Sequence, residues 1–188
     1  MLRNISTWLY CFSRGWVALA ALAIFLLFGA LVLPGQAAAA RVYSAAAGRP
    51  DTSLFYSPSD LLRMAESYGE SGRQAYVRAR FTFDLAFPLV FTFFLASTIS
   101  WLLNRALHPA NRWRLLNLTP LGGMLFDYLE NISAALVIGR YPASTPLLAL
   151  LAPVFTLLKW AFVSGSFLLL AAALYLTLRI NQGKKRIG

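Results

Sequence analysis

Cysteine, histidine and acidic residues are scarce in this chain. Its 188 residues include one Cys, one His and seven Asp or Glu. The lone cysteine, Cys11, permits neither a disulfide within the chain nor a cysteine metal cluster. The lone histidine, His108, lies in a basic loop, where we expect a solvated side chain rather than a ligand. The sequence therefore indicates no metal site and no cofactor.

The sequence also lacks the short motifs of common hydrolases and nucleotide-binding enzymes. It has no G-x-S-x-G, no H-E-x-x-H and no glycine-rich phosphate loop. A net charge of +10 would suggest nucleic acid as the partner of a soluble protein, but no RNP, zinc-finger or helix-turn-helix pattern is present. Basic membrane flanks and anionic lipid headgroups explain the charge better, so we expect membrane lipids as partners and no nucleic acid.

Charged residues of either sign are few, at 13% of the chain, whereas 59% of the residues are hydrophobic. A soluble domain could not cover its surface with so few polar groups. Four apolar segments reach the length of about 20 residues that a membrane-spanning helix needs. They lie at residues 16–33, 82–103, 120–139 and 146–178. We predict an all-α integral membrane four-helix bundle that forms a single domain over residues 1–188.

Prolines suggest where these segments begin and end. Pro34 and Gly35 are expected to stop the first segment. Thr119 and Pro120 are expected to open the third, with Thr119 as the N-cap and proline at the first helical position. The fourth segment is too long to stand upright in a bilayer, so it must tilt, kink near Pro153 or extend beyond the membrane.

The segment between the first and second spans predicts a helical cap outside the membrane, over about residues 57–80. It opens with QAAAARVYSAAAGRP, which we expect to be flexible. Ser57 before Pro58, with Asp60 in the first turn, then predicts a short amphipathic helix that ends at Gly69. The following residues are expected to begin a helix that continues directly into the second span.

Basic residues are distributed unevenly around the spans. Residues 1–15, 104–119 and 179–188 carry Lys and Arg but no acid, whereas the segments on the other side carry four acids as well. The positive-inside rule therefore predicts that both termini are cytoplasmic, in a multi-pass protein of a cell inner membrane. The first span could alternatively be a cleaved signal peptide. Its apolar run exceeds the 7–15 residues usual for such a peptide, so we favour a retained helix.

Five polar residues within the predicted spans form the candidate site: Asp84, Asp127, Glu130, Asn131 and Lys159. Helical spacing places Asp127, Glu130 and Asn131 on one face of the third helix. A carboxylate at mid-bilayer costs at least roughly 2.5–3.5 kcal/mol, so such residues normally have a partner or a task. The register predicts that Glu130 pairs with Lys159 and leaves Asp127 as the unpaired acid.

Three interpretations of this cluster remain open. In the first it is structural, and buried charges hold the bundle together or contact another membrane protein. In the second it binds a small molecule, a cation or a lipid, because three carboxylates against one lysine leave an acidic excess. In the third the protein is a lipid-modifying enzyme with one acid as proton donor and another as base. Binding is the function that we favour. A transport pathway through only four helices would need a homo-oligomer.

Part of the chain resembles a known group of sequences. The residues YGESGRQAYVRARFTFDLAFPLVF, then LFDYLENISAALVIGRYP and TLLKW, cover much of 68–160. They resemble an uncharacterised family of bacterial four-helix integral membrane proteins. The most distinctive piece is the D-x-x-E-N of Asp127, Glu130 and Asn131, preceded by Asp84 and followed by Lys159. The resemblance implies a four-span fold and no activity.

Overall fold

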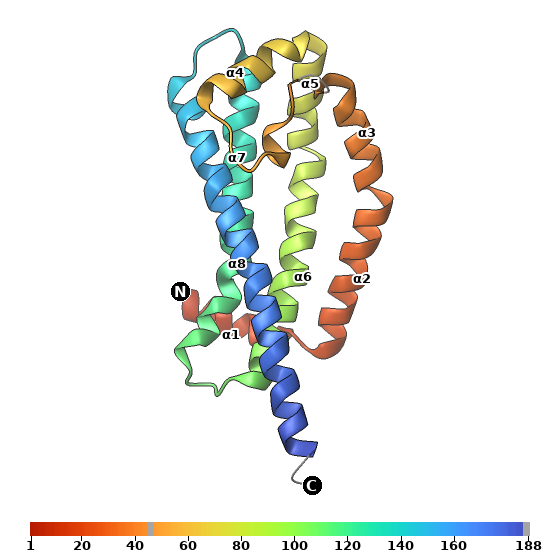
Figure 1. Ribbon diagram of the computed structural model, residues 1–188, viewed down its shortest axis with the longest axis vertical. Helices are drawn as coiled ribbons and strands as arrows, with labels where there is room; N and C mark the ends of the chain where they lie inside the picture. The colour runs from red at the N-terminus through yellow and green to blue at the C-terminus, as the bar shows by residue number, and fades with distance from the viewer. Residues whose placement is uncertain (45–46, 186–188) are drawn as a thin grey trace.

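Helices joined by short connections make up the part that the computed structural model describes, residues 1–44 and 47–185, and no strand occurs there. The long helices run side by side, and α1 and the C-terminal end of α8 lie at the same end of the bundle (Figure 1). The elements are α1 (Leu2–Phe12), α2 (Gly15–Leu31), α3 (Leu33–Ser44), η1 (Pro50–Thr52), α4 (Pro58–Ser67), α5 (Gly69–Arg80), α6 (Phe83–Ala106), η2 (Arg112–Leu118), α7 (Thr119–Arg140) and α8 (Pro146–Lys185).

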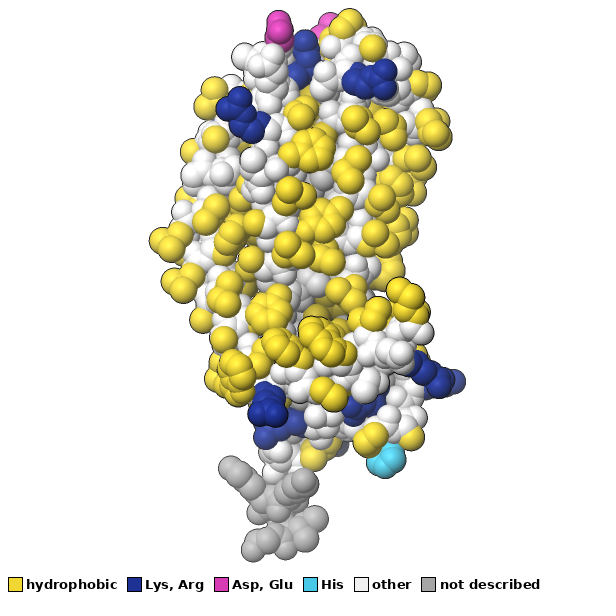
Figure 2. Space-filling model, turned by 180° about the vertical axis from the view of Figure 1, so that it is seen from behind, with side chains coloured by type: hydrophobic (Ala, Val, Ile, Leu, Met, Phe, Trp, Pro, Cys, Tyr) yellow, Lys and Arg dark blue, Asp and Glu magenta, His cyan; other side chains and the backbone are white. Residues whose placement is uncertain are grey.

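Four helical stretches are long and apolar enough to cross a membrane, which confirms the predicted all-α four-span bundle. They are Gly15–Ser44, Gly69–Ala106, Arg112–Arg140 and Pro146–Gln182. Hydrophobic side chains cover the middle of the molecule, and charged side chains gather at its two ends (Figure 2). We call the end that carries α4 and α5 the cap end, and the end that carries α1 the terminal end. The chain is a multi-pass membrane protein.

The first span does not end at Pro34 and Gly35 as the sequence suggested. The helix α2 ends at Leu31, and α3 begins two residues later, with Val32 still in the right-handed helical region. Proline lacks an amide hydrogen, but the first turn of a helix needs none, so Pro34 fits at the start of α3. The small residues after Pro34, predicted to be flexible, are therefore helical as far as Ser44.

The cap contains the predicted amphipathic helix, α4. The amide of Ser57 donates to the Asp60 carboxylate at 2.8 Å, and the Ser57 hydroxyl accepts from the Asp60 amide at 3.1 Å. Gly69 then separates α4 from α5 with a φ of 62°, which favours glycine. The predicted continuous helix into the second span is interrupted, because α5 ends at Arg80 and α6 begins at Phe83.

The third and fourth spans differ from the predictions only at their ends. Leu118, not Thr119, is the N-cap of α7, so Pro120 is the second helical residue rather than the first, although it still lies in the first turn. The helix α8 has 40 residues, which corresponds to about 60 Å of helix against a hydrocarbon thickness of about 30 Å. Figure 1 shows that α8 extends beyond the other helices at the terminal end.

Two apolar cores stabilise the bundle. The core at the cap end is built around Leu61, Tyr76 and Ile138, all fully buried. The core at the terminal end is built around Leu95 and Ile99 of α6, which α2 and α8 cover. Along α8, Lys159 lies between Ala152 of the cap-end core and Ala173 of the terminal-end core, and on α7 the site residues precede Ala134 of the cap-end core. The fold therefore places the candidate site inside the bundle, toward the cap end.

Candidate functional site

The predicted ion pair of Glu130 and Lys159 is present at the centre of the site. The Lys159 ammonium contacts Glu130 Oε2 directly and lies 3.5 Å from Asp127 Oδ1. Glu130 is 1% exposed and Lys159 4%, so the pair is sealed from solvent within the bundle. The Thr156 hydroxyl donates to Glu130 Oε1 at 2.7 Å and adds a further contact across the α7–α8 interface.

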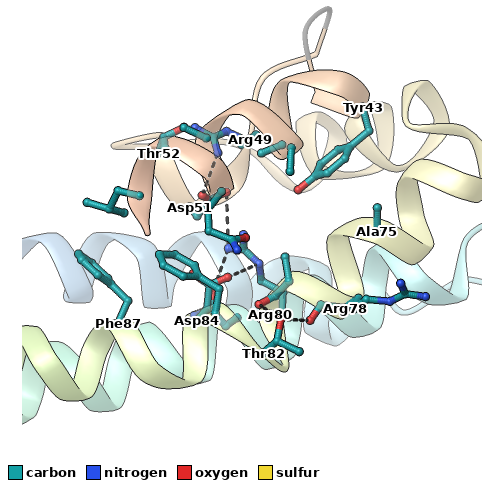
Figure 3. A pocket seen from close by; sticks show the side chains of 18 of the residues that line it. Tyr43, Arg49, Asp51, Thr52, Ala75, Arg78, Arg80, Thr82, Asp84 and Phe87 are labelled. Atoms are coloured by element: carbon teal, nitrogen blue, oxygen red, sulfur yellow. Dashed lines mark hydrogen bonds and ion pairs between the residues drawn. The ribbon is translucent and has the colours of Figure 1, made fainter. Parts of the chain in front are cut away.

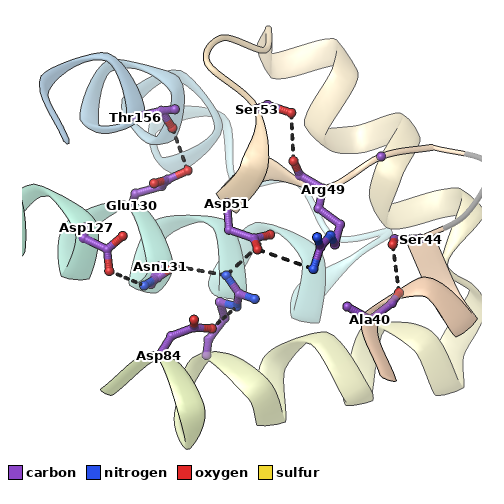
Figure 4. Close-up of polar contacts among 12 residues, drawn as sticks. Ala40, Ser44, Arg49, Asp51, Ser53, Asp84, Asp127, Glu130, Asn131 and Thr156 are labelled. Carbon is purple, nitrogen blue, oxygen red and sulfur yellow. Dashed lines mark hydrogen bonds and ion pairs between the residues drawn. The ribbon is translucent and has the colours of Figure 1, made fainter. Parts of the chain in front are cut away.

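The prediction that Asp127 is unpaired was wrong. Besides its contact with Lys159, Asp127 accepts a hydrogen bond of 3.0 Å from the Asn131 side-chain amide (Figure 4). The register argument placed Lys159 against Glu130 alone, but a long lysine side chain reaches both carboxylates on consecutive turns of α7. The Asp127 side chain keeps 23% of its surface exposed, which distinguishes it from Glu130.

Arg80 connects Asp84 to the rest of the site. Its Nε lies 2.8 Å from Asp84 Oδ2, and its Nη1 donates to Asn131 Oδ1 at 3.3 Å. The same Nη1 lies 3.6 Å from Asp51 Oδ1, and the guanidinium covers the ring of Tyr76 at 4.6 Å. Arg80 thus joins the Asp84 side of the site to the Asp127 side. All five predicted residues belong to one network of contacts.

The segment between α3 and α4 adds residues that the sequence analysis did not assign to the site. Asp51 of η1 points toward Arg80 and also lies 3.8 Å from Arg49 (Figure 3). The Tyr56 hydroxyl lies 3.1 Å from that of Thr156. Burial, and after it the charge of Glu130, raises the pKa of Tyr56, so the phenol stays neutral. This segment closes the cap end of the bundle.

The added residues change the charge balance of the site. From the sequence, three carboxylates faced one lysine, an excess of two negative charges. In the structure Asp51 makes a fourth carboxylate, while Arg49 and Arg80 join Lys159 as cations. Four carboxylates against three cations leave an excess of one. The site is close to neutral, which weakens the argument for a bare cation as the guest.

A cavity of about 510 Å³ opens on one side of the network, between α3, η1, α5, α6 and α7 (Figure 3). We call it the polar cavity. Charged residues of both signs line it in equal number: Arg49, Arg78, Arg80, Asp51, Asp84 and Asp127. Arg78 is exposed and forms no ion pair within residues 1–44 and 47–185. The polar cavity therefore presents both positive and negative groups to a guest.

A second cavity, of about 250 Å³, lies between α6, α7 and α8. We call it the apolar cavity, because its walls are mainly hydrophobic side chains such as Phe91, Val163 and Phe167. The two cavities share three lining residues: Asp51, Phe87 and Asp127. Glu130 lines neither cavity. Asp127 is thus the acid on α7 that a guest could reach, and Glu130 is packed away behind it.

Two further findings bear on the function, one on metal binding and one on similarity to known proteins. Among the described residues, no group of three or more His, Cys, Asp or Glu side chains could hold a metal ion. Comparison of the chain with protein-family models, curated proteins and solved structures finds no match. The functional argument therefore depends on the network and its two cavities.

Proposed function

We propose that this membrane protein binds one amphiphile, with its polar head in the polar cavity and its apolar part in the apolar cavity. The observation that carries the proposal is that Asp51, Phe87 and Asp127 line both cavities, so the two lie on either side of the same side chains. A guest that occupies both would need a polar group and an apolar group joined to one another. Lipids and lipid precursors have this composition.

The head that fits best carries both an amine and an acidic group. Asp127 retains an exposed carboxylate surface at the junction of the cavities, where an ammonium group could pair with it. Arg78 has no acidic partner among the residues described and lines the same cavity, where it could contact a phosphate. A zwitterionic headgroup would pair with both without leaving an uncompensated charge in a low-dielectric region.

The apolar cavity supports the other half of the proposal. Its aromatic and aliphatic walls belong to α6, α7 and α8, which are membrane-spanning helices. The indole of Trp160 donates to the carbonyl of Ser53 at 2.9 Å. This hydrogen bond holds the segment that contains η1 against the cap end of α8. Apolar parts of ligands bind in such mostly hydrophobic, preformed clefts, while a few polar groups fix their orientation.

The two acids of α7 then have different roles. Glu130, Lys159 and Thr156 form a closed group that holds α7 against α8 and positions Asp127 at the edge of both cavities. The structural interpretation thus applies to Glu130, and the binding interpretation to Asp127.

The test is a binding measurement on the full chain in detergent, by native mass spectrometry. The probes are three lipids with the same single acyl chain: a lysophosphatidylethanolamine, a lysophosphatidic acid and a monoacylglycerol. At this site, measured as the binding that is lost when Val163→Phe fills the apolar cavity, we expect the zwitterionic probe to bind at least about tenfold more tightly than the other two, because only its head can pair with Asp127 and Arg78. Equal affinity for all three heads would contradict the assignment of the polar cavity.

Two matched pairs of variants locate the site. Val163→Phe puts bulk into the apolar cavity, whereas Val154→Phe changes a lipid-facing valine of the same helix. Asp127→Asn removes the reachable carboxylate, whereas Asp60→Asn removes a carboxylate of the cap. We expect Val163→Phe and Asp127→Asn each to weaken the zwitterionic probe by at least about tenfold, with the controls near wild type. If Val163→Phe binds like Val154→Phe, the guest does not occupy the apolar cavity.

A further inference from the structure

A third cavity lies at the terminal end, on the opposite end of the bundle from the polar network. It has a volume of about 640 Å³ and is formed by α1, the end of α6 and the segment that leads into η2. Three arginines line it, Arg3, Arg112 and Arg114, together with Asn104 and Asn111. No carboxylate of the described residues lines it, and residues 1–15 and 104–119 contain no acid at all. We call it the arginine cavity.

We propose that the arginine cavity binds the phosphate group of an anionic lipid headgroup. This site is independent of the amphiphile site described above and shares only α6 with it, at the opposite end of that helix. Three guanidinium groups without an acidic neighbour repel one another, and an anion in the cavity would relieve that repulsion. Guanidinium groups also match the geometry of phosphate oxygens, to which they donate two parallel hydrogen bonds.

Arg114, the least exposed of the three arginines, is held in place before any ligand binds. The Arg114 guanidinium stacks on the ring of Tyr10 at 3.7 Å and donates to Leu107 O at 3.1 Å and to Asn104 Oδ1 at 2.9 Å. Tyr10 in turn donates to the backbone carbonyl of Arg114 at 2.7 Å. A guanidinium has five N–H donors, so several remain for an anion. Such preorganisation reduces the entropy lost on binding.

A neutral donor is available beside the arginines. The side-chain oxygen of Asn111 accepts from the backbone amide of Trp113 at 2.9 Å. This bond orients the Asn111 side chain and leaves its NH₂ group free to donate. The site thus combines fixed cationic groups with a neutral donor, which is the composition that phosphate recognition requires.

The surroundings favour a lipid over a free anion as the source of the phosphate. Exposed tryptophans lie around this end: Trp8 is 61% exposed, Trp16 68% and Trp113 55%. The rings of Trp8 and Phe12 on α1 stack at 5.3 Å. Tryptophan concentrates where membrane hydrocarbon meets headgroups, so these side chains place the cavity at headgroup level. Figure 2 shows Lys and Arg beside hydrophobic side chains at this end, where no Asp or Glu is visible on the face in view.

The test compares lipid and phosphate on the full chain in detergent. The probes are dioctanoyl phosphatidylglycerol, dioctanoylglycerol, which has the same acyl chains but no phosphate, and inorganic phosphate. Native mass spectrometry should show one phosphatidylglycerol bound at least about tenfold more tightly than dioctanoylglycerol, and inorganic phosphate should displace it only weakly. If inorganic phosphate binds as tightly as phosphatidylglycerol, the cavity is a free-anion site and the proposal fails.

A control variant at a nearby arginine distinguishes binding in the arginine cavity from general attraction to the positive surface. Arg3→Gln combined with Arg112→Gln removes two exposed guanidinium groups from the cavity. Arg105→Gln removes a guanidinium at the same end that does not line it. We expect the double variant to bind phosphatidylglycerol at least about tenfold more weakly and Arg105→Gln to bind it within about twofold of wild type. Equal losses in the two proteins would show diffuse attraction and would overturn the proposal. Neither result depends on Asp127 or Val163.

Discussion

Removing one partner of the Glu130–Lys159 pair should destabilise the protein more than removing both. The pair is buried at 1% and 4% exposure, so a charge left without its partner has no water to solvate it. Loss of one partner of a buried ion pair typically costs about 3–5 kcal/mol, whereas replacement of both by groups of similar volume can be nearly neutral. The variants are Glu130→Gln, Lys159→Met and the double substitution.

The structure predicts that the two single variants are unequal. In Glu130→Gln, Lys159 keeps its contact with Asp127 at 3.5 Å, so the loss in the free energy of unfolding should be near the lower end of this range, about 3 kcal/mol. In Lys159→Met, two carboxylates on consecutive turns of α7 lose their shared cation, so the cost should approach about 5 kcal/mol. The double variant should recover at least half of the Lys159→Met loss, because only Asp127 remains without a cation and Asn131 still donates to it.

Melting temperature in detergent is a suitable assay, and Glu66→Gln, an exposed acid in α4, is the matched control. At about 2–4 °C per kcal/mol, Glu130→Gln should melt roughly 6–12 °C below wild type and Lys159→Met roughly 10–20 °C below it. The melting temperature of the control should change by no more than a loss of about 0.5 kcal/mol in the free energy of unfolding would produce, which is the effect expected for a surface substitution. A double variant that melts no higher than Lys159→Met would refute the pairing argument.

Three further predictions concern groups outside the membrane-spanning segments. Burial raises the pKa of Tyr10 to about 12. The contribution of Tyr10 to stability should therefore be complete below pH 10 and lost as the pH rises to about 12. In thermal melts, the advantage of wild type over Tyr10→Phe should shrink across that window. Hydrogen bonds from Ser57 lower the pKa of Asp60 to about 2. The N-terminal capping of α4 by Asp60 should therefore persist above about pH 4 and weaken as the pH falls to about 2. Circular dichroism of wild type and of Asp60→Asn would detect this loss of helix. In a Cys11→Ser background, single cysteines at positions 110 and 55 should react with a membrane-impermeant reagent from opposite sides of the membrane, with position 110 on the cytoplasmic side. Labelling of both positions from one side would show that the second span does not cross the membrane.

The sequence allowed the spans and the central ion pair to be predicted, for simple physical reasons. Long apolar runs have few alternatives to crossing a membrane, and a lysine and a glutamate inside such runs can escape their desolvation cost only by pairing. Helical periodicity was enough to bring Glu130 and Lys159 to facing sides of α7 and α8. The capping pattern of Ser57 and Asp60 was predictable because it depends only on residues three positions apart.

The other half of the site could not be predicted, because it depends on contacts between distant segments. Arg80 falls just before the apolar run of the second span, so composition placed it outside the membrane segment. Asp51 lies in a segment without periodicity, and nothing local indicates that this segment turns inward to meet Arg80. Without Arg49 and Arg80 the site looked more acidic than it is. Asp127 looked unpaired because the register placed Lys159 against Glu130 alone. Pro34 was misread because a proline ends one helix and begins another equally well.

The central claim, that an amphiphile spans both cavities, is tested most directly by photocrosslinking at the residue where the cavities meet. Phe87 is replaced by p-benzoylphenylalanine, and the control places the same group at Leu89, which is 53% exposed on the lipid-facing side of α6. The protein is purified from its membrane in detergent, washed free of loosely held lipid, irradiated and analysed by mass spectrometry. We expect a lipid adduct with a zwitterionic head at position 87 and none at position 89. Absence of an adduct at position 87, or equal adducts at both positions, would contradict the account.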